Sequence, residues 1–550
     1  MDSANPQPED SPEDDTAEEQ VADSGSEDTG SADTGSADTG TEDTGSEGGD
    51  TGLEGGDTSE PAPIDTSTLQ GAAASSGRRV GVALSSSAYA SDPDYLALLV
   101  EEFGGITPEN ATKWGPLQPT ADSWDFSTAD DMVSFALDND LRVKGHTLLW
   151  HSQMPDWVDE SMSAAELQSA VDSHVETTLL HFGSDVQDWD VVNEALEWDG
   201  SLRESLYLTK LGSDYIADAF LLASEFAPDA RLFYNDYSIE GYNSKSDALI
   251  EIVADLLDAG VPIHGIGMQM HLTHDSAPSR VDIRGNMERM AALGILVHVS
   301  EMDVQIRHLQ GPESERLLAQ AMTYYDVAAA CVEVAGCEQL SFWGFTDRYS
   351  WIDSWYGDDD PLLYDEDLMP KPAREAVHAA LLGEPMAGCA ESRLSNGDFE
   401  AGTDEWTTWG STLDTVSEPV YEGSSASFST ERSEAWQGPV QPLLGVISTG
   451  HVYQGTGWVL LDNAASAEVK MTLHWNDDAG DHWTTVDMIT ASDSEWMELS
   501  GVVDFGSDRV TGAVTEASLY IEGPPSGVNF YADAVALHPV CPDTAVPISR

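Results

Sequence analysis

The chain has few basic residues and no long hydrophobic run. Its 550 residues include 22 Lys and Arg against 100 Asp and Glu, which gives a formal net charge of -78. This shortage of cations excludes nucleic acid as a partner, because phosphates are bound by Lys and Arg, and it disfavours anionic membrane surfaces. The charge instead favours solubility, tolerance of salt and a neutral partner. No apolar run approaches the ~20 residues that a membrane span requires.

Cysteines are also scarce, and no signal peptide is visible, because the first residues are acidic and polar. The four cysteines come without a CxxC pair or a histidine cluster, which disfavours a metal site. Cys331 and Cys337 are close in sequence, whereas Cys389 and Cys541 flank the whole C-terminal segment. This spacing predicts one local disulfide and one that clamps a domain, with free buried thiols as the alternative. Disulfides are typical of exported proteins, so we expect a secreted or cell-surface protein.

Basic residues are absent from the first 77 positions, where Asp, Gly, Ser and Thr recur in short repeats. Such a segment cannot bury enough surface to fold, so we predict a disordered acidic spacer over residues 1–77. Its repeats match no EF-hand loop, which argues against calcium binding there. Beyond it we predict a catalytic domain over residues 78–384, a linker over 385–393, a β-rich module over 394–541 and a tail over 542–550.

Eight short apolar stretches, most of them followed by a helical pattern, predict an α/β fold of the (β/α)8 TIM-barrel type. The predicted strands are residues 80–84, a short stretch at 105, 142–150, 186–196, 230–237, 263–272, 295–304 and 339–347. Amphipathic helices lie between them, for example at 246–259 and 314–334. A doubly wound open sheet is the alternative, but no glycine-rich phosphate loop follows the first strand. After residue 382, alternating runs with turn signals predict an all-β jelly-roll or β-sandwich.

Polar and aromatic residues gather at the carboxyl ends of the predicted strands, which is the rim that carries the active site of a (β/α)8 barrel. Glu194 lies at the end of the fourth predicted strand, and Glu301 lies in the seventh. Core packing explains a single polar or aromatic residue at a strand end, but it does not explain such residues at the ends of most of the predicted strands. Aromatic faces stack on sugar rings, and amides, His and Lys bond hydroxyls, so the rim indicates carbohydrate chemistry. Its other candidates are Glu109, Asn110, Lys113, His146, Trp150, His151, Asn193, Gln269, His271, Asp303, Trp343 and Trp351.

Six motifs occur in a fixed order between residues 78 and 382: ENATKW, GHTLLWH, WDVVNEA, GMQMHL, VSEMD and FWGFTDRYSW. This region resembles glycoside hydrolase family 10, the endo-β-1,4-xylanases. The resemblance implies that Glu194 is the acid/base and Glu301 the nucleophile, that Asn193 bonds the sugar 2-hydroxyl, and that His271, held by Asp303, orients Glu301. A disulfide within CVEVAGC also fits the family. The glycone subsites would be lined by Glu109, Asn110, Lys113, His146, Trp150, Gln269, Trp343 and Trp351.

Two carboxyl groups suffice for this chemistry. One protonates the leaving oxygen and the other meets the anomeric carbon, and in a retaining enzyme they lie about 5–5.5 Å apart. Glu194 must be protonated in the first step, which the nearby negative charge of Glu301 favours, and must ionise once that charge is consumed. The same residue then acts as base. We expect a monomer that needs no cofactor for catalysis and acts on xylan or xylo-oligosaccharides.

The stretches NGDFEAGTDEWTTWG, RSEAWQGP, ASLYIEG and NFYADAVAL resemble carbohydrate-binding modules of families 4, 9 and 22, with the xylan-binding family 22 closest. The resemblance implies glycan contacts from Trp436, Tyr520 and Glu522, and a structural Ca2+ held by Glu400 and Asp533. The alternative for Trp436 and Tyr520 is that they fill the sandwich core.

Two other functions stay open at this point. A catalytically silent protein would use both domains as lectins, although the presence of both Glu194 and Glu301 argues against this. The same chemistry could also act on cellulose or mixed-linkage glucan. Trp343 and Trp351 would exclude a hydroxymethyl group on C5 of the sugar only if their rings crowd that position, which the sequence does not reveal.

Overall fold

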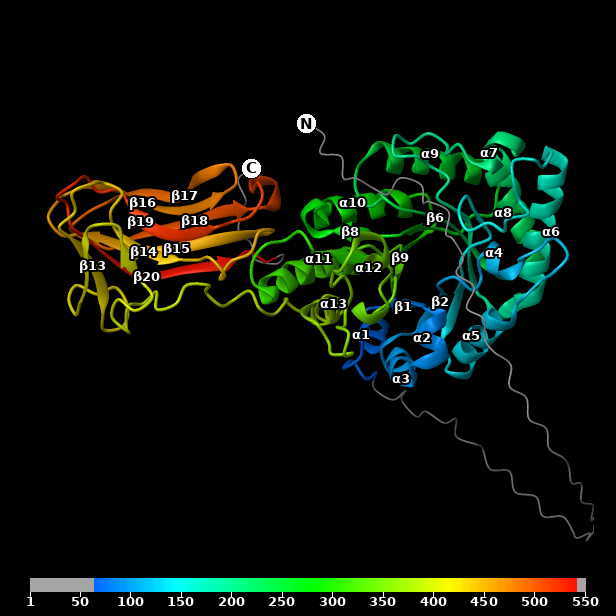
Figure 1. The fold of residues 1–550 in the computed structure, drawn as a ribbon, viewed down its shortest axis with the longest axis horizontal. Helices are drawn as coiled ribbons and strands as arrows, with labels where there is room; N and C mark the ends of the chain where they lie inside the picture. The colour runs from blue at the N-terminus through cyan, green and yellow to red at the C-terminus, as the bar shows by residue number, and fades with distance from the viewer. Residues whose placement is uncertain (1–63, 542–550) are drawn as a thin grey trace, which may run out of the picture. The chain divides into compact units, whose positions relative to one another are not determined.

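A computed structural model describes residues 64–541 of the chain (Figure 1). The greater part of the predicted acidic spacer, residues 1–63, and the predicted tail, residues 542–550, lie outside the described residues. Within residues 64–541 no helix is long and apolar enough to cross a membrane.

The first domain is a closed parallel barrel. Its strand order is β10-β1-β2-β3-β5-β6-β7-β9, and β9 pairs in turn with β10, so the sheet has no open edge. The predicted (β/α)8 barrel is therefore confirmed, and the doubly wound sheet, which would leave two edges, is wrong. The strands are β1 (Arg79–Leu84), β2 (Gly105–Pro108), β3 (Arg142–Gly145), β5 (Asp188–Asn193), β6 (Arg231–Asp236), β7 (Gly265–Met268), β9 (Leu296–Gln305) and β10 (Cys337–Phe342).

Two predicted strands are interrupted in the structure. Residues 142–150 form β3 and then the short β4 (Leu149–Trp150), which pairs with β5. Residues 263–272 form β7 and then β8 (His271–Thr273), which pairs with β9. Met270, between the latter two, has a left-handed backbone with φ 63°. In both cases the chain leaves the barrel wall and then re-enters a ladder at the rim, so Trp150 and His271 are held by strand pairing beyond the wall.

Helices surround the barrel, as Figure 1 shows, and their caps are readable in the sequence. Ser163 begins α6 with a capping box that Glu166 completes, and Asn243 begins α9 in the same way with Ser246. The helices are α1 (Leu69–Ser75), α2 (Ser86–Ser91), α3 (Pro93–Glu102), α4 (Trp114–Leu117), α5 (Ser127–Asp138), α6 (Ala164–Phe182), α7 (Leu206–Leu211), α8 (Tyr215–Phe226), α9 (Ser244–Asp258), α10 (Arg280–Ala291), α11 (Glu313–Glu333), α12 (Trp351–Tyr356) and α13 (Pro372–Leu382).

Helix α1 corrects the predicted domain boundary, because it lies inside the stretch that we assigned to the spacer. Leu69, Ala72 and Ala73 are fully buried, and α1 packs against α13. Its sequence, LQGAAAS, contains no charged residue and few large apolar ones, so its composition resembles the preceding repeats. Small side chains pack closely here, and this burial is visible only when the neighbouring helix is present.

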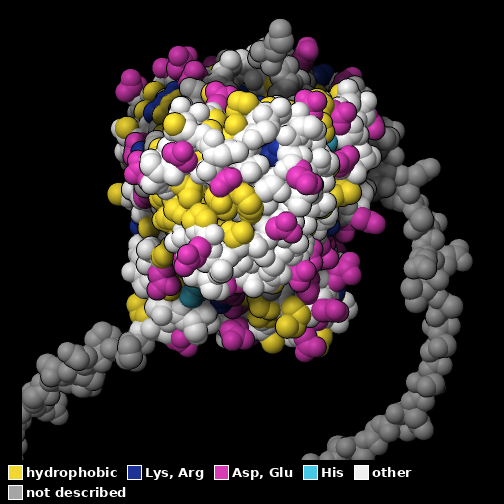
Figure 2. Space-filling model, turned by 90° about the vertical axis from the view of Figure 1, so that its left-hand side faces the viewer, with side chains coloured by type: hydrophobic (Ala, Val, Ile, Leu, Met, Phe, Trp, Pro, Cys, Tyr) yellow, Lys and Arg dark blue, Asp and Glu magenta, His cyan; other side chains and the backbone are white. Residues whose placement is uncertain are grey.

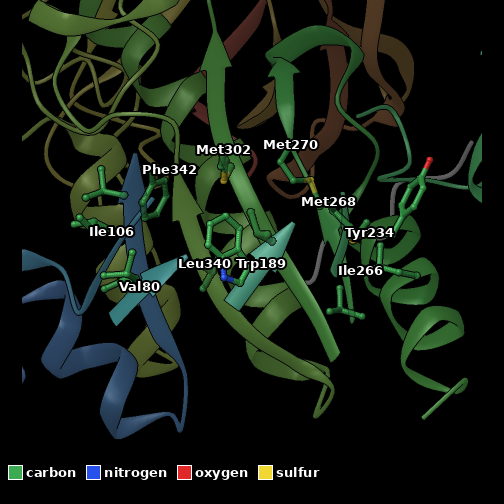
Figure 3. Packing of buried hydrophobic residues seen from close by; sticks show 14 of the residues in the cluster. Val80, Ile106, Trp189, Tyr234, Ile266, Met268, Met270, Met302, Leu340 and Phe342 are labelled. Atoms are coloured by element: carbon green, nitrogen blue, oxygen red, sulfur yellow. The ribbon is translucent and has the colours of Figure 1, made fainter. Parts of the chain in front are cut away.

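Buried apolar side chains from successive strands pack into one hydrophobic cluster with residues of the surrounding helices, as Figure 3 shows for Val80, Ile106, Ile266 and Leu340. Trp189, on β5, is the largest fully buried side chain. Its indole lies against Gly145, where an added Cβ would stand 2.3 Å from the ring. Only glycine fits at this position, because a protein interior has no spare volume.

The second domain is a sandwich of two five-stranded antiparallel sheets, which confirms the predicted all-β module. The first sheet has the order β11-β14-β19-β16-β17, and the second sheet has the order β12-β13-β20-β15-β18. The strands are β11 (Thr407–Thr408), β12 (Thr412–Val416), β13 (Ala426–Thr430), β14 (Pro439–Pro442), β15 (His451–Leu461), β16 (Ala467–Asp477), β17 (Gly480–Ala491), β18 (Met497–Phe505), β19 (Glu516–Glu522) and β20 (Phe530–Pro539).

Both predicted disulfides are present. Cys331 pairs with Cys337 across the end of α11, with their Cα atoms 5.2 Å apart. Cys389 pairs with Cys541 at 6.0 Å between Cα atoms, which joins the segment before the module to the residues that follow its last strand. The alternative of free thiols is wrong, since all four cysteines are bonded.

Candidate active site

Glu194 is the first residue after β5, at the carboxyl end of the barrel. Its backbone is left-handed with φ 56°, and its N–H donates to the carbonyl of Asn235 (2.9 Å) at the end of β6. A non-glycine residue in this conformation is costly, and such residues concentrate at functional sites. The strand therefore ends by turning the Glu194 side chain into the rim.

Two side chains from other segments of the barrel rim bind the Glu194 carboxyl group. Trp150 donates its indole N–H to Oε2 (2.9 Å), and Gln269 donates an amide N–H to Oε1 (3.0 Å). Nδ1 of His151 lies 4.0 Å from Oε2. The Glu194 side chain keeps 13% of its surface exposed, so it is oriented by the protein yet accessible to a ligand.

Glu301 lies in β9 and is only 5% exposed. Asn235 donates an amide N–H to Oε1 (2.6 Å), and Nε2 of His271 lies 3.3 Å from Oε2. Burial acts to raise the pKa of Glu301, but His146, His271 and the Asn235 hydrogen bond outweigh it and lower the pKa to about 2. Glu301 is thus an ionised carboxylate over the whole ordinary pH range.

His271 is held by Asp303, as we predicted. Its Nδ1 lies 2.8 Å from Oδ2 of Asp303, which also accepts the indole N–H of Trp351 (2.8 Å). Burial acts against a charged imidazole, but Asp303 and Glu301 raise the pKa of His271 to about 10. The imidazolium therefore donates one N–H to each of two carboxylates.

The predicted glycone residues after β2 form a connected polar group. Nζ of Lys113 donates to Oδ1 of Asn110 (2.8 Å) and to Oε1 of Gln153 (2.5 Å). Burial lowers the pKa of Lys113 to about 8 although the nearby carboxylates oppose the shift. Burial likewise raises the pKa of Glu109, with the Lys113 charge acting against it. Lys113 lies close enough to Glu301 and Glu194 for their charges to interact.

Aromatic rings complete the rim. Trp150 lies under Nζ of Lys113, 4.8 Å from the ring centroid. His146 packs edge-on against Trp343 at 5.2 Å, and His271 packs edge-on against Trp351 at 5.1 Å. The structure thus brings together the residues that we predicted for the barrel site, although they come from six different segments.

Several neighbours of the carboxylates were missed in the sequence. Asn235 bonds Glu301 and lies 2.9 Å from the Asn193 amide oxygen. Its signal was present, because it lies near the carboxyl end of the predicted strand 230–237, as Asn193 lies near that of 186–196. Asp190 accepts from His146 (3.0 Å) inside the barrel. Its signal was a charged residue among the apolar residues of the predicted strand. Gln153, which follows the GHTLLWH motif, had no comparable signal.

Another group lies next to Glu194, in the segments that follow β5 and β6. Arg203 donates to the Glu194 carbonyl (2.9 Å) and to the Tyr237 hydroxyl (2.6 Å). Trp198 packs edge-on against Tyr237 at 5.4 Å and is 47% exposed. None of these three residues was singled out in the sequence, because none belongs to one of the six motifs.

The module carries a cleft of about 520 Å³ on the outward face of its first sheet. Trp436 is 45% exposed there, which rules out the core alternative for this residue. Tyr520 is nearly buried, but its neighbours Leu519 and Ile521 face the core, so its side chain faces the cleft. Glu522 lines the same cleft and is held by Lys470 (3.0 Å). We did not predict the other residues that line the cleft, which are Trp409, Thr472, His474, Trp483 and Thr485.

The carboxylates of Glu400 and Asp533, as they are hydrogen-bonded in the structure, do not fit the predicted calcium site. The Glu400 carboxylate accepts the N–H groups of Ser424 (2.6 Å) and Ser425 (2.9 Å) and the Ser424 hydroxyl. Asp533 accepts the N–H groups of Tyr421 (2.9 Å), Glu422 (3.1 Å) and Ala534 (2.7 Å). N–H donors thus face the oxygens that Ca2+ would require. Over residues 64–541 no three acidic, His or Cys side chains gather in a way that could hold a metal.

The chain matches two protein-family descriptions. Residues 68–380 match "Glycosyl hydrolase family 10", and residues 392–527 match "Carbohydrate binding domain". Endo-1,4-beta-xylanase B of Thermotoga neapolitana is 39% identical over 285 residues, which cover 52% of this chain and 82% of that protein. Endo-1,4-beta-xylanase 1 of Humicola insolens is 36% identical over 306 residues, covering 55% and 71%.

A solved structure agrees with these matches. The crystal structure of xylanase 10B from Thermotoga petrophila in complex with xylobiose is 37% identical to this chain, with a TM-score of 0.55, and covers 57% of this chain and 97% of that one. The first family match includes every strand of the barrel and both rim carboxylates. The chain belongs to glycosyl hydrolase family 10.

Proposed function

We propose that the protein is an endo-β-1,4-xylanase that cleaves xylan with retention of configuration. The observation that carries the proposal is the unequal environment of the two rim carboxyl groups. Glu301 is bound by an amide N–H and an imidazolium, which favour its charged form. Glu194 is more exposed, and neighbouring groups orient its carboxyl group. A residue that exchanges a proton with substrate and water needs both properties.

In the first step, Glu194 gives its proton to the glycosidic oxygen while a carboxylate oxygen of Glu301 bonds to the anomeric carbon. The bond between that carbon and the leaving oxygen breaks, and a glycosyl-enzyme ester forms on Glu301. Gln269 and Trp150 keep the Glu194 carboxyl group directed at the rim during this transfer. Asn193 bonds the 2-hydroxyl of the sugar, where hydrogen bonds strengthen in the transition state.

In the second step, Glu194 takes a proton from a water molecule, whose oxygen attacks the anomeric carbon. The ester bond breaks and Glu301 leaves as a carboxylate. Asp303 binds the other nitrogen of His271 whether or not Glu301 is charged, and it favours the cationic form of His271 in both steps. The imidazolium therefore stabilises the negative charge that returns to Glu301 as the ester breaks.

The two sides of the rim bind different parts of the chain that is cleaved. Glu109, Asn110, Lys113 and His146 surround the sugar that becomes bonded to Glu301. Trp198 and Tyr237 lie beyond Glu194, which is the side of the leaving group, so they stack on the sugar that departs. Sites on both sides of the scissile bond favour cleavage within a polysaccharide over removal of single terminal sugars.

The module binds the same polysaccharide in its cleft, where Trp436 and Trp483 flank an opening lined by Tyr520 and Glu522. Exposed rings and buried hydrogen-bonding groups in one cleft are the usual means of holding a neutral sugar chain. Two disulfides and a polymeric substrate that cannot enter cells are consistent with an enzyme that works outside the cell.

Product analysis on xylan, carboxymethylcellulose and mixed-linkage glucan tests the proposal. We expect short xylo-oligosaccharides from xylan at early times, with the β-anomer formed first, and little release from either glucan. Release of the α-anomer first would contradict retention, and faster turnover of a glucan would contradict the substrate.

A further inference from the structure

Five aromatic residues form a continuous surface on the outward face of the module's second sheet. Tyr421 stacks on Trp458 (4.0 Å between ring centroids, 11° between planes) and Phe428 stacks on Tyr531 (4.4 Å, 13°). Trp496 links the two pairs, at 6.0 Å from Tyr421 and 6.5 Å from Tyr531. We call these five residues the outer aromatic surface.

The module's core does not require these rings. On β15 the side chain of Val459 faces the core, so the side chain of Trp458, its neighbour on the strand, faces out. On β20 Phe530 and Ala532 are fully buried, whereas Tyr531 is half-buried. Large aromatics on the solvent side of a sheet cost solubility, and a contiguous group of them marks a binding surface.

The loop that carries Tyr421 is held rigidly against the sheet. Asp533 accepts the N–H groups of Tyr421 (2.9 Å) and Glu422 (3.1 Å), and Glu400 accepts those of Ser424 and Ser425. These are the acidic residues for which the sequence predicted calcium. Their hydrogen bonds fix the loop before any ligand arrives, which removes much of the entropy cost of binding.

Hydrogen-bonding side chains border the rings. Asp462 accepts from the Tyr531 hydroxyl (3.2 Å) and from Asn529 (3.1 Å), and Glu498 is the cross-strand partner of Trp458. The charge at this border is negative, and Figure 2 shows how widely Asp and Glu outnumber Lys and Arg on one face of the molecule. An anionic partner is therefore repelled, whereas a neutral polyhydroxylated chain finds acceptors for its hydroxyls and rings for its apolar faces.

We propose that the outer aromatic surface is a second binding site for xylan, on the sheet opposite the cleft. The proposal rests on the carbohydrate binding that we propose for the module. A xylan chain held at both sheets would bind with the affinity of two linked sites. Each site therefore contributes to the overall affinity even if it binds weakly alone.

Four full-length proteins test this, all carrying Glu301→Gln so that xylan stays intact. One has no further change, a cleft variant adds Trp436→Ala and Trp483→Ala, a surface variant adds Tyr421→Ala and Trp496→Ala, and a combined variant carries all of these. Binding to insoluble xylan is measured by depletion isotherms, in which the barrel contributes equally to every protein. We expect the surface changes to weaken binding about fivefold, both alone and on top of the cleft changes. Equal affinities of the cleft and combined variants would overturn the proposal.

The outcomes separate this surface from the module's proposed function. If only the cleft changes weaken binding, the proposed function of the module is supported and the proposal for the outer aromatic surface is overturned. If neither pair of changes weakens binding, both proposals are overturned. A direct readout is the 19F resonance of 5-fluorotryptophan at Trp496, assigned with Trp496→Phe. It should shift when xylohexaose is added to the cleft variant, and an unchanged resonance at saturation would also overturn the proposal. Tyr421 is 41% exposed, so its removal leaves the core intact, which matching unfolding temperatures verify.

Discussion

His271 lies 3.3 Å from Oε2 of Glu301 through its Nε2 atom and is cationic, because Asp303 binds its other nitrogen at 2.8 Å. A buried carboxylate is thereby kept ionised by a buried cation that has a counter-ion of its own. The arrangement separates two tasks: Asp303 sets the charge and orientation of His271, and His271 sets the charge of Glu301.

Replacing His271 with Asn should move the acid limb of the kcat/KM profile. The depressed pKa of Glu301, about 2, means that activity is kept until the pH falls towards that value. The asparagine side chain would keep a hydrogen-bond donor but lack the positive charge, so the pKa of Glu301 should rise and activity should be lost at a higher pH, by more than about one unit. The measurement is kcat/KM against pH on an aryl xyloside. His181→Asn, far from the rim and paired with Asp130, is the matched control. An unmoved acid limb would contradict the role of His271.

Replacing Glu301 with Ala should abolish hydrolysis, by about 10⁴-fold or more, because no group remains to meet the anomeric carbon. The fold should be kept, as judged by an unchanged circular dichroism spectrum. Azide added to this variant should restore turnover by attack from the face that Glu301 occupied, giving an α-glycosyl azide. Turnover of xylan at the original rate would disprove the assignment.

Replacing Glu194 with Ala should affect substrates according to their leaving group. On xylan, kcat/KM should fall by about 10²–10⁴-fold, because the leaving oxygen is no longer protonated. On a dinitrophenyl xylobioside, which needs no proton, the first step should fall by less than about tenfold. Pre-steady-state release of dinitrophenolate measures that step directly, and a burst followed by slow turnover is expected. Equal losses on both substrates would mean that Glu194 is not the acid.

Calcium should leave the module's stability unchanged, because N–H donors already face the carboxylates of Glu400 and Asp533. The unfolding temperature is compared after treatment with EDTA and after addition of millimolar CaCl2. A rise with calcium, lost in Asp533→Asn, would restore the calcium site that the family resemblance implies.

Replacing Gly145 with Ala should lower the free energy of unfolding by about 1–3 kcal/mol, the usual cost of overpacking a core. The new methyl group would stand 2.3 Å from the Trp189 ring, which is fully buried and cannot move away. Gly104→Ala is the control, because the nearest atoms to its added Cβ lie at 3.7 Å. Urea denaturation measures both, and equal stabilities would show that the barrel can relax around Trp189.

The barrel and most of its site could be predicted because strand ends carry the chemistry. Glu194 and Glu301 follow apolar stretches, and the parallel order of the strands brings such ends to one rim. Helix α1 could not be recognised, since its small residues are indistinguishable from a linker until α13 covers them. Trp409 and Trp483 of the module cleft were missed for a related reason: they come from distant segments and share a surface only once the first sheet has formed.

By itself the sequence determined the barrel, the sandwich, the cysteine pairs and the identity of two rim carboxyl groups, because periodicity, spacing and motifs are local properties of the chain. Only the tertiary structure decided the charges within the rim. The pKa of Glu301 is lowered by His146, His271 and Asn235, which come from three other segments of the chain, and electrostatic interactions depend on distance in space rather than in sequence.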